Sequence, residues 1–233
     1  MKKPSAVILE YIETEILPQY SSIGGHTDEH IRQVMERSMR FMRQAGNVNP
    51  NMVILIASYH DLGRLIDNER HNFESAKMLR KDKFLKKHFS GEEIEIMAQA
   101  VEDHRSSLGH EPRSIYGKIV SSADRNPDLD TAMKRSYDYF KHLSPDADED
   151  DVIEDCRQHL RKKYSPDGYA ANTMYFDDPD FHGFLIKIEE VTRDSEDFKK
   201  RMKEFNQRRN KWYIDIILLW KSLRKNAQTV APA

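Results

Sequence analysis

Residues 52–64 read Met-Val-Ile-Leu-Ile-Ala-Ser-Tyr-His-Asp-Leu-Gly-Arg, an apolar run that closes on the adjacent pair His60 and Asp61. An apolar run of this length, preceded by Asn49 as cap and Pro50 in the first turn, predicts a buried helix. Burying a charged group is costly unless a metal ion or a partner compensates it. Because an imidazole nitrogen and a carboxylate oxygen can bind one divalent cation together, the pair predicts part of a metal site at the end of this helix.

Two further polar residues continue the apolar faces of their own predicted helices. His30 lies one turn before Val34, and Asp124 follows Tyr116 and Val120 at intervals of four residues. A single residue of this kind is more often a satisfied core histidine or a capping aspartate than a metal ligand. Together with the pair that ends the apolar run, however, these polar groups on inward faces need a common partner.

The order of these residues along the chain adds to the argument. His30, the pair His60-Asp61 and Asp124 follow one another at intervals of about thirty and about sixty residues. With the flanking stretches 62–64 and 118–125, this set resembles the HD-domain metal-dependent phosphohydrolase superfamily over roughly residues 24–130. The resemblance implies an all-α fold, an HD-domain helical bundle with a C-terminal helical extension. It also implies a metal ion held by His30, His60, Asp61 and Asp124.

The resemblance suggests roles for residues around these four ligands. Asp61 can also orient or deprotonate a metal-bound water, and His104 can act as the acid for the leaving alkoxide. For His71 and His104 two roles stay open, contact with the phosphate or ligation of a second metal, because some HD enzymes use two further histidines from these regions to hold a second metal. The residues that we expect to contact substrate are His26, Arg64, His71, Lys118 and Arg125.

The expected activity is metal-dependent hydrolysis of a small phosphoester, with a nucleotide as the substrate class. The cofactor is one or two divalent ions, and the nitrogen and oxygen ligands suit Mn, Fe, Co, Ni, Zn or Mg without choosing among them. Two alternatives stay open. One is a noncatalytic HD module that senses a nucleotide, and the other is an HD oxygenase with a di-iron site, which needs more ligands than four.

Composition limits the other classes of function. The chain has 233 residues, of which 33% are charged and 38% apolar, with only nine glycines and nine prolines, and its net charge is −2. These values favour a helical protein and give no basic field that would make nucleic acid the main partner. Cys156 is the only cysteine. We expect a cytoplasmic protein that binds a small phosphorylated substrate and no membrane, with a homodimer as one possible assembly.

The pattern along the chain predicts helices throughout. Two regions are expected: an HD-domain helical core over residues 1–145, and a helical extension over 146–233 that packs on the core. The core begins with a helix over residues 5–20, and Ser90 and Glu93 have the spacing of a capping box. The extension ends with a long helix over about 182–208 and a final one to about 225.

Overall fold

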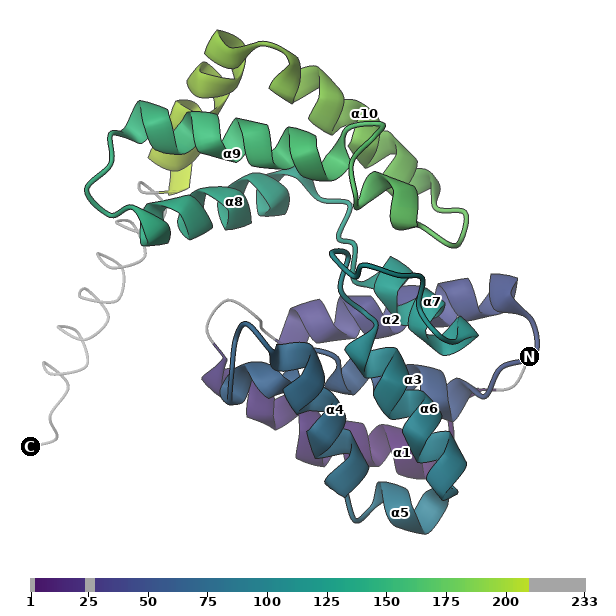
Figure 1. Cartoon of the computed structure of the whole chain (residues 1–233). Helices are drawn as coiled ribbons and strands as arrows, with labels where there is room; N and C mark the ends of the chain where they lie inside the picture. The colour runs from purple at the N-terminus through teal and green to yellow at the C-terminus, as the bar shows by residue number, and fades with distance from the viewer. Residues whose placement is uncertain (1–2, 24–27, 210–233) are drawn as a thin grey trace, which may run out of the picture. The chain divides into compact units, whose positions relative to one another are not determined.

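The computed structural model describes residues 3–23 and 28–209. Helices make up the regular structure of these residues, which contain no strand, so the predicted all-α fold is confirmed (Figure 1). The chain divides into two compact units. Of the described residues, the first unit comprises 3–23, 28–127 and 166–183, and the second comprises 128–165 and 184–209. Within the described residues, no helix has the length and hydropathy that crossing a membrane requires.

The first unit begins with a helical segment whose hydrogen-bonding pattern changes twice. The α-helix α1 (Ala6–Tyr11) continues as the π-helix η1 (Ile12–Ile16) and then as the 3-10 helix η2 (Leu17–Ser22). The helix predicted for 5–20 is therefore present over residues 6–22, but only its first part, α1, is α-helical. Pro18 has no amide N–H to donate, which prevents the regular α-helical pattern from continuing through it.

The core of this unit surrounds α3 (Pro50–Tyr59), in which every residue except Asn51 is buried. Around it pack α2 (Asp28–Ala45), α6 (Gly91–Glu102) and α7 (Ile115–Ala123) (Figure 1). The side chain of Asn49 accepts a hydrogen bond from the Asn51 amide, which confirms the predicted cap. The apolar run therefore forms the central helix and delivers His60 and Asp61 to its end.

The chain after α3 returns to the same helices. The 3-10 helix η3 (Leu62–Leu65) packs against α4 (His71–Lys81), and α4 packs in turn against α6. The short helix α5 (Leu85–His88) connects α4 to α6. Consequently the beginning of α4 lies beside the ends of α3 and α6, where polar residues of the sequence were expected to meet.

The second unit contains α8 (Leu129–Leu143), α9 (Glu149–Tyr164) and the later part of α10 (Pro179–Arg193), followed by a helix over 195–209. The continuous helix predicted for 182–208 is wrong because it is interrupted at Asp194. The Asp194 side chain accepts a hydrogen bond from the Asp197 amide and begins a new helix there. The predicted helix to about 225 lies outside the described residues.

These units differ from the predicted regions 1–145 and 146–233. The helices α8 and α9, on either side of the predicted boundary, belong to the same unit, and residues 166–183 belong with the first unit. This returning segment includes the 3-10 helix η4 (Ala171–Thr173). Packing of the extension on the core stays a prediction.

Candidate metal centre

Helix ends position the candidate ligands. A helix end leaves backbone groups without partners and lets a side chain leave the regular ladder, so it suits a polar site in an otherwise apolar core. One residue lies in the first turn of α2, two at the end of α3, one at the start of α4, one just after α6 and one at the end of α7. In this order they are His30, His60 and Asp61, His71, His104, and Asp124.

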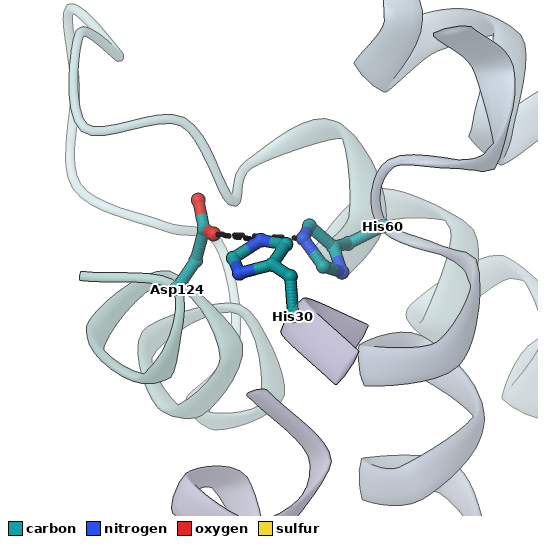
Figure 2. Close-up of side chains that lie close together, drawn as sticks. All are labelled: His30, His60 and Asp124. Atoms are coloured by element: carbon teal, nitrogen blue, oxygen red, sulfur yellow. Dashed lines mark ion pairs between the residues drawn. The ribbon is translucent and has the colours of Figure 1, made fainter. Parts of the chain in front are cut away.

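The first ligand group consists of His30, His60 and Asp124, which converge from α2, α3 and α7 (Figure 2). Oδ1 of Asp124 lies 3.2 Å from Nε2 of His30 and 3.5 Å from Nε2 of His60. Both imidazoles are buried, whereas the Asp124 side chain is 27% exposed. The group can therefore hold a metal ion at a position that stays partly open to solvent.

The second ligand group consists of Asp61, His71 and His104, all of which are buried. Nε2 of His71 lies 3.2 Å from Oδ1 of Asp61, and Nε2 of His104 lies 3.7 Å from the same oxygen. The two imidazole nitrogens are 3.3 Å apart. The other oxygen of Asp61 lies 3.5 Å from Nε2 of His60 and 4.0 Å from Nε2 of His30. Asp61 therefore faces both groups, one with each oxygen.

Hydrogen bonds to the backbone fix the orientation of three of these imidazoles. In each, Nδ1 bonds the carbonyl oxygen three residues earlier. A carbonyl can only accept, so Nδ1 carries the proton, and in the neutral ring Nε2 presents a lone pair to the site. The pairs are His60 with Ala57 at 2.8 Å, His71 with Asn68 at 2.9 Å, and His104 with Val101 at 2.7 Å.

Burial and charge together set the protonation of the site. Burial lowers the pKa of His60, but the carboxylates of Asp61 and Asp124 outweigh it and raise that pKa to about 9. Burial and the nearby charge of His60 lower the pKa of His104 to about 3. The facing imidazoles hold the pKa of both carboxyl groups below the usual range, although burial opposes this. The carboxylates are therefore ionised and His104 is neutral at neutral pH.

This arrangement fits a divalent metal ion. The lone pairs of His71 and His104 and an oxygen of Asp61 point toward one another, which is unfavourable unless a cation or a proton lies between them. Burial lowers the pKa of both imidazoles and so disfavours the proton. In the first group, the buried Nε2 of His60 makes no hydrogen bond within the described part of the chain. Nitrogen and oxygen donors without thiolate suit the first-row divalent ions.

The cationic residues singled out from the sequence have different surroundings. Nε of Arg64 lies 3.0 Å from Oδ1 of Asp61, beside the second ligand group. Lys118 instead pairs with Glu111 at 2.6 Å and faces the ring of Tyr175.

Arg125 is buried and donates hydrogen bonds to Ser121 and Thr173. His26 lies outside the described residues. Among the described residues that were expected to contact substrate, Arg64 as well as His71 lies beside a carboxylate of the ligand groups.

Sequence analysis did not single out residues that hold the second ligand group in place. Nδ2 of Asn72, next to His71, donates to the carbonyl oxygen of Glu102 at 2.8 Å and so ties the start of α4 to the end of α6. Arg113 pairs with the buried Asp103, which precedes His104. Neither contact has a local sequence signal, because each joins residues that are ten or more positions apart.

Comparison with known families agrees with this geometry. The family model of the HD domain matches residues 27–126. Over these residues the chain is similar to an HD domain. The matched region includes both ligand groups, from His30 to Asp124, and the resemblance found in the sequence is confirmed. No curated protein and no solved structure gives a match.

Proposed function

We propose that this protein is a metal-dependent phosphohydrolase that hydrolyses a small phosphoester, with a nucleotide as the substrate class. HD domains are characteristic of metal-dependent phosphohydrolases, which gives the proposal its general direction. The observation that carries it is the sharing of Asp61 between two groups of buried ligands. Such an arrangement suits two neighbouring cations, which phosphoester-cleaving enzymes commonly use.

Each residue of the site has a distinct task in this proposal. His30, His60 and Asp124 would hold one cation, His71 and His104 would hold the other, and Asp61 would join the two. When bound there, divalent cations supply Lewis acidity and lower the pKa of a water molecule from near 16 to about 7. The Nδ1 hydrogen bonds keep the rings in the orientation that ligation requires.

For His71 and His104 the geometry favours ligation over the roles that we first assigned to them. An acid needs a proton to give, yet the Nδ1 proton of His104 is donated to Val101 and its low pKa leaves Nε2 without one. His71 has the same anchoring and faces the same oxygen of Asp61. We therefore propose both as ligands of the second cation.

Arg64 is the residue that we propose for contact with the substrate. Its side chain is 19% exposed and its Nε lies beside the carboxylate of Asp61. A guanidinium at this place can compensate charge on the nonbridging oxygens of a phosphoryl group. Roles for His26, Lys118 and Arg125 in substrate binding stay predictions, as does a cytoplasmic location.

Phosphate release from a panel of nucleotide mono-, di- and triphosphates tests the function. We expect release with Mn²⁺, Co²⁺, Ni²⁺ or Mg²⁺, none after chelation, and a loss of at least a hundredfold in His60→Ala. His110→Ala is the matched control, because His110 is exposed and belongs to neither ligand group. No release from any member of the panel with any of these metals would contradict the proposal.

A di-iron oxygenase is the second candidate, and the same geometry favours it over a simple sensor. That class needs more ligands than four, and His71 with His104 supply them beside Asp61. Protein purified with iron that consumes oxygen but releases no phosphate would favour the oxygenase. A nucleotide-sensing module would instead bind nucleotide without either reaction.

A further inference from the structure

Arg37 binds the chain on both sides of the candidate ligand Asp124. Its Nε donates to the carbonyl oxygen of Ala123 and its Nη2 to that of Arg125, each at 3.0 Å. These carbonyls lie where α7 ends, so they lack the partners that a continuing helix would provide. Because a guanidinium is planar and rigid, binding both carbonyls fixes the peptide groups that carry the Asp124 side chain.

Asp178 in turn holds Arg37. Oδ2 of Asp178 accepts a hydrogen bond of 2.6 Å from Nη2 of Arg37, and Oδ1 accepts one of 3.0 Å from Arg40. The Asp178 side chain is 1% exposed and that of Arg37 13%. A buried ion pair is costly to form and costly to break, so this one restricts Arg37 to a single arrangement.

The segment that carries Asp178 is fastened to the same helices by further hydrogen bonds. The Tyr175 amide donates to Oγ of Ser122, in the last turn of α7, at 3.1 Å. Asp177 exchanges hydrogen bonds with the side chain of Gln44 on α2, at 2.9 and 3.0 Å. Thr173 accepts a hydrogen bond from Arg125. Residues 173–178 therefore bridge the end of α7 and the helix α2, which carries both His30 and Arg37.

We propose that Arg37 is a positioning residue for the metal ligand Asp124. Residues 173–178, which lie outside the matched HD region, hold Arg37 and the end of α7 in place and so support the first ligand group. The inference rests on the proposed metal-dependent function. Asp124 has the more exposed side chain of the two carboxylates in the site and ends a helix, so its own packing restrains it less than that of Asp61. The contacts of Arg37 supply the missing restraint.

Titration of chelator-treated full-length protein with Co²⁺ by calorimetry tests the inference. Arg37→Met should weaken binding at the first group by about 10- to 100-fold, as loss of a partner that orients a ligand typically does. Binding at the second group, which lacks Asp124, should keep its wild-type affinity and serves as an internal reference. Arg40→Met is the matched control, because Arg40 also pairs with Asp178 but has no hydrogen bond to Ala123 or Arg125 among those described.

Arg37→Lys covers the case in which Arg37→Met does not fold. A lysine keeps the charge opposite Asp178 but cannot bind both carbonyls with a rigid fork, so the first affinity should still fall while the protein stays folded. Wild-type affinity in Arg37→Lys, or equal losses in the Arg37→Met and Arg40→Met proteins, would overturn the inference and leave the proposed function standing. A wild-type protein that binds no Co²⁺ would overturn both.

Discussion

The two oxygens of Asp61 face different imidazoles, Oδ2 toward His60 at 3.5 Å and Oδ1 toward His71 at 3.2 Å. Asp124 has no such double role, since it faces only the first ligand group. The two aspartates should therefore differ in what their removal costs, although both are acidic ligands in the same small site. Comparing the effects of removing each aspartate therefore distinguishes two metal sites that share Asp61 from a single metal site.

Asp61→Asn should lose the metal of the second group and weaken the first, because His71 and His104 keep no carboxylate in their group. Asp124→Asn should lose only the first metal. We expect two ions per chain in the wild-type protein, below one in Asp61→Asn and about one in Asp124→Asn, measured by elemental analysis after dialysis against a low concentration of Mn²⁺. Equal metal content in the two variants would contradict a bridging role for Asp61.

Helix packing places His71, at the start of α4, next to Asp61. The backbones of η3 and α4 approach each other closely at Gly63. The Gly63 amide donates to Oγ of Ser75 at 2.7 Å, and that hydroxyl donates to the carbonyl oxygen of His60 at 3.0 Å. A Cβ at Gly63 would lie 2.2 Å from the carbonyl oxygen of His71 and 2.4 Å from the amide nitrogen of Ser75. Both are backbone atoms, so neither can move aside without moving α4.

Gly63→Ala should therefore destabilise the protein by about 1–3 kcal/mol or more, as overpacking does. It should also lower metal binding by the second group, because α4 carries His71. Gly91→Ala is the control, since a Cβ there meets nothing within 4 Å, and it should be neutral or stabilising by up to about 1 kcal/mol. Urea unfolding of both variants gives the comparison, and similar midpoints would show that η3 and α4 can separate freely.

Elements were predictable from the sequence where the deciding residues are close neighbours. The capping box of Ser90 and Glu93 is present, because its hydrogen bonds join residues three apart. The interruption at Asp194 was missed, although aspartate is a common cap, because no glycine or proline marks it. A helix boundary of this kind depends on whether a single side chain hydrogen-bonds to a nearby backbone group.

At the scale of the whole molecule, the candidate metal ligands could be predicted from the sequence, whereas the contacts that hold these ligands in position could not. His30, His60, Asp61 and Asp124 could be found because each continues an inward stripe or run of its own helix. The contact of Arg37 with Asp178 could not, since it joins residues 141 positions apart. Arg37 does lie two turns after His30 on the same helix, and a charged residue on the face that carries a ligand is a sequence signal for this role.

The stability of the whole molecule should fall in alkaline solution, because the second unit contains a buried thiol. Burial raises the pKa of Cys156 from 9.0 to about 11, and its side chain is fully buried. The unfolded chain ionises first, so the stability that the neutral thiol contributes is complete below pH 9 and is lost as the pH rises to about 11. A shift of this size corresponds to roughly 2–3 kcal/mol.

Urea unfolding at pH 8 and pH 10.5 should therefore show a smaller loss of stability in Cys156→Ala than in the wild-type protein. The comparison between the two proteins removes the contribution of other groups that titrate in this range, such as Tyr11, whose pKa burial and Asp82 raise to about 12. Equal losses in the two proteins would mean that the thiolate is accommodated in the folded second unit.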